Sequence, residues 1–210
     1  DITLNDASNN FATVIITSGN NVTLVDAGAI ALGASTVAGT YSVTAGGAIT
    51  NTGALAITGA ATFVATSSYD ITLNNASNNF SSVIITSGRN VTLVDAGAIA
   101  LGASTVSGTL SVTAGGAITD TGTLAVASAA ATFAATSSYD ITLNDASNNF
   151  ATVIITSGNN VTLVDAGAIA LGASTVAGTY SVTAGGAITN TGALAITGAA
   201  TFVATSSYDI

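Results

Sequence analysis

The sequence predicts an all-β protein that folds as a single-stranded parallel β-helix, or β-solenoid, with about three turns in each repeat of 69–70 residues. Three observations predict this fold. One tandem repeat accounts for the whole chain. Short runs of β-branched residues alternate with small polar ones and are separated by Gly, Asn, Ser and Asp. No segment of ten residues or more shows a helical period.

The repeat is defined by the segment DITLN, which begins at Asp1, Asp70 and Asp140 and starts again at Asp209. Residues 140–210 match residues 1–71 at every position, whereas the middle copy differs at several positions and has one extra Ala. We therefore expect one continuous rod with repeats at 1–69, 70–139 and 140–208. Residues 209–210 would begin a further repeat, so we interpret the chain as part of a longer array without the capping repeats of a free-standing solenoid.

Each copy contains nine short candidate strands joined by turn residues. In the first copy they are ITL from Ile2, TVIIT from Thr13, NVTLV from Asn21, AIALG from Ala29, STV from Ser35, YSVT from Tyr41, AIT from Ala48, ALAIT from Ala54 and ATFVA from Ala61. The related runs that begin at Asn21, Thr40 and Ala61 are 19 and 21 residues apart. Three strands per turn and three turns per copy fit this spacing, with neighbouring turns about 4.8 Å apart. The turn dipeptides Asn-Gly and Asp-Gly are missing from the sequence, which argues against hairpins and a propeller.

Alternation assigns a buried and an outer side to each strand. The larger apolar residues, such as Leu24 and Phe63, are expected to point inward, with Thr and Ala between them pointing outward. Several outer residues are themselves small or apolar, and because the chain has almost no charge to hold rods apart, we expect a lateral contact stripe along the rod. Its members would be Val25, Ala31, Ala56, Val64, Ala100 and Ala170.

Composition excludes several classes of function. The chain has one basic residue, ten acidic ones and a net charge of −9, so it offers no basic surface for nucleic acid. Polar residues interrupt every apolar run before it is long enough to span a membrane, and no membrane insertion is expected. With no His, Lys, Cys or Glu, a Ser or Thr nucleophile has no activating base. We expect no enzyme, no metal and no cofactor.

Two binding functions remain as alternatives. Acidic solenoids can hold calcium in stacked turns, but the Gly-Asp nonapeptide that does so is missing here. Rows of outward Thr could bind ice, with Thr3, Thr23, Ser42 and Thr62 as the first candidates. A β-helical enzyme acting on polysaccharides is less favoured still, because Asp1, Asp6 and Asp26 all stand in turn-like contexts where Asp bonds its own backbone.

The segment TLSVTAGGAITDTGTLAV at Thr109–Val126, together with NVTLVDAGAIALG before it, resembles the repeats of filamentous-haemagglutinin-type bacterial surface proteins. The resemblance covers essentially the whole chain. It implies a right-handed β-helical shaft of an extracellular or bacterial cell-surface fibre or adhesin, without catalysis. Its partners would be further copies of itself, joined end to end and packed side by side. The family's secretion cap and adhesive tip have no counterpart here, so the resemblance implies no receptor-binding residue.

Overall fold

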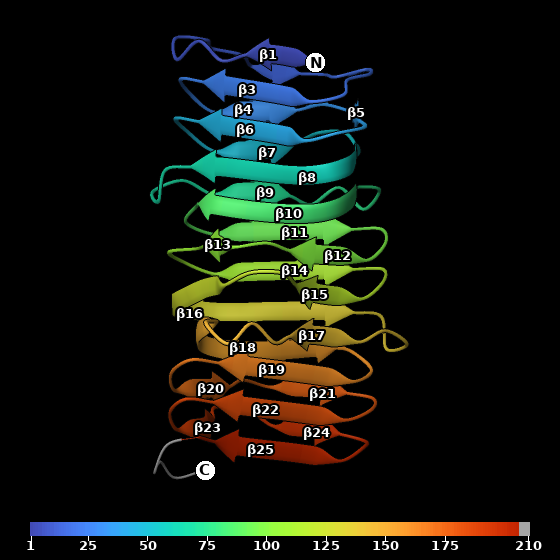
Figure 1. The fold of residues 1–210 in the computed structure, drawn as a ribbon, viewed down its shortest axis with the longest axis vertical. Helices are drawn as coiled ribbons and strands as arrows, with labels where there is room; N and C mark the ends of the chain where they lie inside the picture. Colours follow the sequence, from blue (N-terminus) through green and yellow to red (C-terminus); the bar gives the residue numbers. More distant parts are fainter. Residues whose placement is uncertain (206–210) are drawn as a thin grey trace.

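The computed structural model describes residues 1–205 and shows a straight rod of stacked turns (Figure 1). Neighbouring strands run parallel in both main sheets, and residues 1–205 contain no helix. The predicted fold class, a parallel β-solenoid with a tandem repeat, is confirmed. The proposed start of a further repeat at residues 209–210 lies outside the described residues.

Two long sheets form opposite sides of the rod. The first sheet has 12 strands, with β5 (Ser35–Val37) joined at the side to β8. Its other strands follow one another in the order β1 (Ile2–Leu4), β3 (Val22–Asp26), β6 (Tyr41–Ala45), β8 (Leu55–Ala65), β10 (Asn79–Ser87), β12 (Ile99–Leu101), β15 (Ile118–Asp120), β17 (Ile141–Leu143), β19 (Val161–Asp165), β22 (Tyr180–Ala184) and β25 (Ala200–Ala204).

The second sheet has 11 strands, with β13 (Ser104–Thr105) joined at the side to β16. A separate two-stranded sheet pairs β21 (Ser174–Val176) with β24 (Leu194–Ile196). The order along the second sheet is β2 (Thr13–Val14), β4 (Ile30–Leu32), β7 (Ile49–Asn51), β9 (Ile71–Leu73), β11 (Val91–Asp95), β14 (Leu110–Ala114), β16 (Leu124–Ala135), β18 (Asn149–Ser157), β20 (Ile169–Leu171) and β23 (Ile188–Asn190).

Successive copies start on opposite sides of the rod. Between β3 and β11 the chain passes through β4, β6, β7, β8, β9 and β10 and alternates between the two sheets, so it crosses the rod seven times, an odd number. The NVTLV strand therefore lies in the first sheet as β3, in the second as β11, and in the first again as β19. Figure 1 shows this as a reversal of arrow direction, since β3 and β19 point left and β11 points right.

The strand order also refines the turn count. Seven steps along the first sheet lead from β3 to β19, which are two copies apart. Each copy thus makes three and a half turns, close to the three that strand spacing predicts. Because each copy makes an odd number of half-turns, the next copy begins in the opposite sheet, and only the copy after that returns to the first sheet. The structural period is therefore two copies, the same as the sequence period.

Alternation of side chains builds one narrow core along the rod. The predicted inward residues are all no more than 2% exposed, namely Val22, Leu24, Ile30, Leu32, Tyr41, Val43, Leu55, Ile57 and Phe63. Differences between copies keep this core apolar, since Leu110 replaces Tyr41 and Val126 replaces Ile57, and both replacements are buried. The assignment of inward positions is confirmed.

The paired glycines of the AGGA segment are explained by the stacking of turns. A Cβ on Gly46 would lie 2.2 Å from the carbonyl oxygen of Ala27, and one on Gly47 would lie 2.7 Å from the backbone nitrogen of Ala29. Neither glycine has a positive φ. Glycine is therefore required here because the backbone of one turn lies directly against the backbone of the turn before it.

The extra Ala of the middle copy is absorbed in a bulge. Strand β8 has 11 residues and its counterpart β16 has 12. The pairing of β16 with β18 shifts register between Val126 and Ala130, where β16 passes from pairing with β13 to pairing with β14. A bulge at this position takes up one residue without moving the core strands on either side.

Candidate functional site

The outer surface of the two sheets is the candidate site, and the six residues predicted to form a lateral stripe lie on it. None of the six is buried, whereas the residues before and after each of Ala31, Ala100 and Ala170 in their strands are. Their predicted outward direction is therefore correct.

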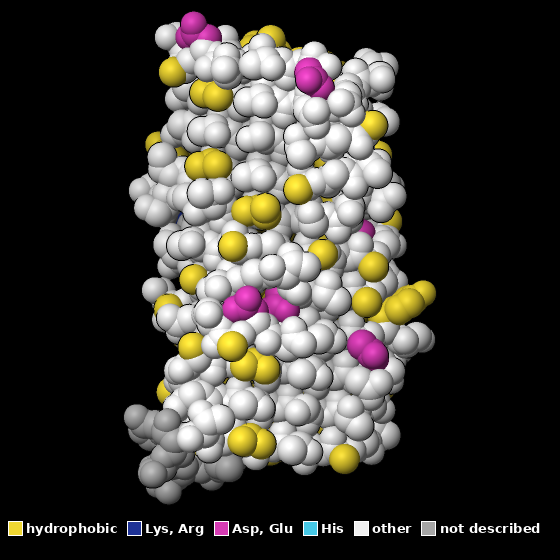
Figure 2. All heavy atoms as spheres, viewed as in Figure 1, with side chains coloured by type: hydrophobic (Ala, Val, Ile, Leu, Met, Phe, Trp, Pro, Cys, Tyr) yellow, Lys and Arg dark blue, Asp and Glu magenta, His cyan; other side chains and the backbone are white. Residues whose placement is uncertain are grey.

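The prediction that these residues recur on one side in every copy is wrong. Ala31 and Ala170 lie in the second sheet and Ala100 in the first, because each copy is turned by half a turn from the last. Along its column Ala31 stands between Thr13 and Thr50. Figure 2 shows the resulting pattern on one face, where hydrophobic side chains form separate small spots among polar ones.

Polar residues also separate the other three predicted stripe residues, Val25, Val64 and Ala56, from further apolar side chains. Val25 and Val64 flank Thr44 in one column of the first sheet, and Ala56 pairs with Thr36 and Asn79 at the side of the rod. The apolar outer residues are therefore spots spaced by hydroxyl and amide side chains, not a continuous stripe.

Hydroxyl side chains form the continuous feature of the outer surface. In each sheet one outward position carries Thr or Ser on five successive strands, paired in register. These columns are Thr50, Thr72, Thr92, Ser111 and Thr132 in the second sheet, and Thr119, Thr142, Thr162, Ser181 and Thr201 in the first. Each column repeats at the strand spacing of about 4.8 Å.

One corner of the rod carries a polar ladder that starts at a partly exposed Asp. Asp70 accepts hydrogen bonds from the backbone and side-chain nitrogens of Asn90, each at 3.1 Å. Asn90 in turn accepts from the backbone nitrogen and hydroxyl of Thr109, also at 3.1 Å. Arg89 donates from Nε at 2.8 Å and from Nη2 at 3.0 Å to the two Asp70 oxygens. The Arg89 guanidinium lowers the pKa of Asp70 to about 2.

A second type of Asp is buried and joins two turns. Asp95 is 3% exposed. Its Oδ2 accepts from the Phe80 nitrogen at 2.6 Å and its Oδ1 from the Gly97 nitrogen at 2.7 Å. Burial raises the pKa of Asp95, and these two amide donors offset part of that rise. Asp165 repeats the arrangement with Phe150 in the third copy, and burial raises its pKa as well.

A buried Asn joins each copy to the next. The amide nitrogen of Asn78 donates to the carbonyl oxygens of Leu73 and Val94, at 3.2 and 3.3 Å. Its oxygen accepts from the Leu55 backbone nitrogen at 3.0 Å and from the Asn51 side chain at 2.8 Å. Asn78 therefore binds the preceding copy through its oxygen and its own copy through its nitrogen.

The carboxylates are used as acceptors for amide donors. Asp6 accepts from the Ser8 nitrogen at 2.8 Å, and Asp120 accepts from the Asn144 nitrogen and the Asn148 side chain at 2.9 and 2.7 Å. Within residues 1–205, no three His, Cys, Asp or Glu side chains gather where they could hold a metal ion. A helix long and apolar enough to cross a membrane is likewise not found in this part of the chain. The arrangement fits a structural use of these side chains.

Comparison with protein families identifies the repeat. The model of a family described as "Repeats of unknown function (DUF5649)" matches residues 19–87, 88–157 and 158–210. This chain belongs to that family. The DUF5649 matches have the same 69–70-residue period as the DITLN segments, with their boundary placed at Gly19, Gly88 and Gly158. No curated protein and no solved structure matches the chain.

The buried polar residues are the feature that sequence reasoning missed. Asp26 was expected to bond backbone in a turn, which it does at Gly28, but it is also 2% exposed and reaches the turn before it. A signal was available inside the DUF5649 repeats themselves. Asp26 recurs as Asp95 and Asp165, whereas the exposed Asp6 is Asn75 in the middle copy.

Proposed function

We propose that these repeats form the non-catalytic shaft of an extracellular fibre or giant adhesin on a bacterial surface, of the kind seen in filamentous-haemagglutinin-type proteins. The observation that carries the proposal is the unbroken stack of turns, built from nearly identical repeats, around one core. Such a stack gives a stiff spacer, and its polar groups are used to join turns. The low charge, absence of Cys and resemblance of the SVTAGGAIT block support the same assignment.

Lateral packing of shafts is the part of this function that the surface residues can test. The small outer side chains would let two flat sheets approach to about 10 Å. The triple variant Ala31→Lys, Ala100→Lys and Ala170→Lys places charge on both sides of the rod, because Ala100 lies in the opposite sheet from the other two. Bundles seen by electron microscopy should separate into single rods, most clearly at low salt.

A matched control places charge at a corner instead of on a sheet. Asn20→Arg and Asn159→Arg copy Arg89 into the other two repeats, next to Asp1 and Asp140. This variant should bundle like the unmodified chain. Bundles that persist in the triple Lys variant would exclude the two sheet faces as lateral contacts.

Immunolabelling of native cells should show the repeats in surface filaments, and labelling confined to the cell interior would contradict the shaft proposal.

The hydroxyl columns favour one second candidate, an ice-binding surface. Five Thr or Ser side chains in register on each sheet form a regular array of methyl and hydroxyl groups on a rigid backbone. Ice crystals grown in the purified protein should then become faceted. Thr72→Lys and Thr92→Lys in the second sheet, combined with Thr142→Lys and Thr162→Lys in the first, should abolish the effect. Unaltered ice growth in the unmodified protein would remove this candidate.

A further inference from the structure

A small hollow on the outside of the rod, here called the side hollow, has no role in the function proposed above. It lies at the junction between the first and second copies and has a volume of about 270 Å³. Its lining comes from β8, from β10 and from the residue before β12, which belong to three successive turns of the rod. The exposed residues that line it include Thr58, Asn79, Ser81 and Ala98.

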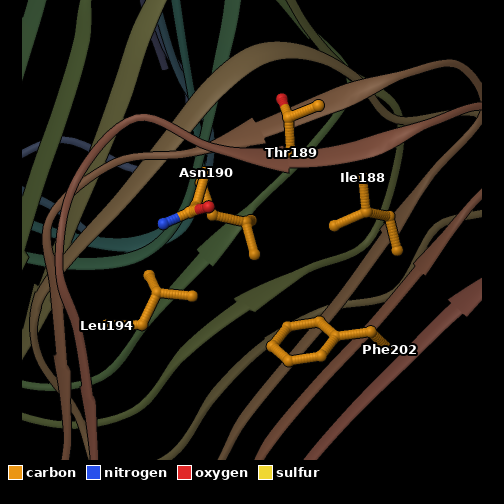
Figure 3. A pocket seen from close by; sticks show the side chains of 6 residues that line it. Ile188, Thr189, Asn190, Leu194 and Phe202 are labelled. Atoms are coloured by element: carbon orange, nitrogen blue, oxygen red, sulfur yellow. The ribbon is translucent and has the colours of Figure 1, made fainter. Parts of the chain in front are cut away.

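A larger hollow, of about 330 Å³, lies at the last described turn, where Leu194 and Phe202 point into it (Figure 3). It adjoins the limit of the described chain at residue 205 and carries no inference. The side hollow, in contrast, has described turns on both sides of it. It is therefore the hollow whose surroundings can be used to infer a ligand.

A break in the pairing of two strands forms the side hollow. Phe80 and Ser82 of β10 pair with Ile57 and Ala60 of β8, so β8 has one more residue than β10 between the two pairs. A bulge of this kind redirects the side chains beside it. Ile57 and Phe80 are no more than 2% exposed and close the hollow on the side of the core. Because paired strands lie on both sides of the bulge, the hollow is a fixed part of the rod.

Three polar side chains border the side hollow without partners of their own. Thr58, Asn79 and Ser81 are exposed, and none of their side chains makes a hydrogen bond within residues 1–205. The neighbouring Asn78 differs, because it is buried and uses both its amide nitrogen and its oxygen inside the rod. A hydroxyl and a primary amide can each donate and accept hydrogen bonds. The border of the hollow can therefore bind a ligand that also does both.

The lining determines the chemical class of that ligand. No charged residue lines the side hollow, so neither an anion nor a cation would find an opposite charge there. The volume is just below the range of about 300–1,000 Å³ that is usual for small-molecule sites, which limits the ligand to a single small ring. A neutral sugar ring fits these requirements, since it has hydroxyl groups around its edge and C–H groups on its faces.

We propose that the side hollow binds one neutral hexose unit of a glycan. Thr58, Asn79 and Ser81 would form hydrogen bonds with its hydroxyl groups, and Ala98 on the third turn would contact its C–H groups. The rest of the glycan can extend into solvent, because the hollow lies on the outside of the rod. This binding activity goes beyond the shaft proposal, and it can fail without affecting that proposal, which is tested by surface labelling of native cells.

The junction between the second and third copies provides a comparison within the same chain. Ala127 replaces Thr58 and Ala151 replaces Ser81, whereas Asn149 keeps the place of Asn79. The bulge there is also longer by the extra Ala of the middle copy. Of these two junctions only the first offers all three polar side chains, so we expect it alone to bind the sugar.

An NMR titration of the full chain labelled with ¹⁵N tests the proposal. The probes are D-glucose, D-galactose, D-mannose and N-acetyl-D-glucosamine, each added separately. At least one should shift the amide signals of Thr58, Asn79 and Ser81, with a dissociation constant on the order of 1 mM for so small a ligand. The signals of Asn149 should stay in place. The uronic acid of the sugar that binds should bind more weakly, because it brings a carboxylate to an acidic rod without a cation in the hollow.

The double variant Thr58→Ala with Ser81→Ala copies the second junction into the first. It should weaken binding about tenfold, since two hydrogen bonds to the sugar are lost. Thr119→Ala with Thr142→Ala is the matched control, because it removes two outward hydroxyls farther along the same sheet and should bind like the unmodified chain. If circular dichroism shows that the double variant loses β-structure, Asn79→Ala at an exposed position takes its place. The proposal is overturned if none of the four sugars shifts the signals, if the double variant binds as before, or if the control loses as much.

Discussion

Replacing one glycine of the AGGA segment should push two neighbouring turns apart and destabilise the rod. Gly115 lies in the middle copy, where a Cβ would stand 2.2 Å from the carbonyl oxygen of Ala96 in the preceding turn. Gly97 lies in the same copy, and its added Cβ would meet nothing closer than the Asp95 Oδ1 at 3.5 Å. Gly115→Ala and Gly97→Ala are therefore a matched pair that differ in clearance from the neighbouring turn.

The magnitude follows from the spacing of the turns. To bring a Cβ from 2.2 Å to ordinary contact, the two turns must separate by roughly 1 Å. That movement stretches the hydrogen bonds from Gly115 to Asp95 and from Gly116 to Gly97, now 2.9 and 2.7 Å. Overpacking costs about 1–3 kcal/mol, and each weakened bond adds about 1 kcal/mol. We expect Gly115→Ala to lower the free energy of unfolding by about 3–5 kcal/mol.

The control should behave in the opposite way. Gly97 has no positive φ, so Ala fits its backbone and restricts the unfolded chain, which stabilises by about 0.4–1 kcal/mol. Urea unfolding followed by circular dichroism measures both variants, and hydrogen exchange shows whether protection is lost around residues 95–116. Equal midpoints for Gly115→Ala and the unmodified chain, or equal damage from Gly97→Ala, would refute the close-approach argument.

Three further predictions use the polar groups. Tyr41→Phe should leave the free energy of unfolding unchanged or raise it by up to about 1 kcal/mol. The reason is that the buried Tyr41 hydroxyl lacks a well-formed hydrogen bond among the described residues. The midpoint of urea unfolding measures this change. Burial raises the folded-state pKa of Asp95 and Asp165, so the contribution of these two groups to stability should increase as pH falls from neutral toward the ordinary pKa of a carboxyl group, and should be lost again as pH rises. Replacing both with Asn should flatten that dependence in urea titrations at each pH. Arg89→Asn should leave the midpoint nearly unchanged, since the ion pair is exposed, but should raise the pKa of Asp70 from about 2, as followed by NMR.

Much of the candidate surface could be derived from alternation, since one face of each strand must be buried. That reasoning placed Ala31 and Val25 outward correctly. It could not show that Ala31 and Ala100 lie on opposite sides of the rod. The side that a residue occupies depends on how many times the preceding chain crosses between the two sheets. Strand spacing suggested three turns for each copy, and the additional half-turn places Ala31 and Ala100 in opposite sheets.

The sequence by itself determined the local pattern and the repeat. Period-two alternation, turn residues between short strands and the exact recurrence of DITLN predict a parallel solenoid with one core, because short strands joined by turns can stack turn upon turn around a single core. Only the tertiary structure decided what lies one turn above each residue. The need for glycine at Gly46, the burial of Asp95 and the link from Asn78 to Leu55 all arise between residues about a turn apart. Such contacts depend on register and on half-turns, and these are set by how whole turns stack, which no short segment specifies.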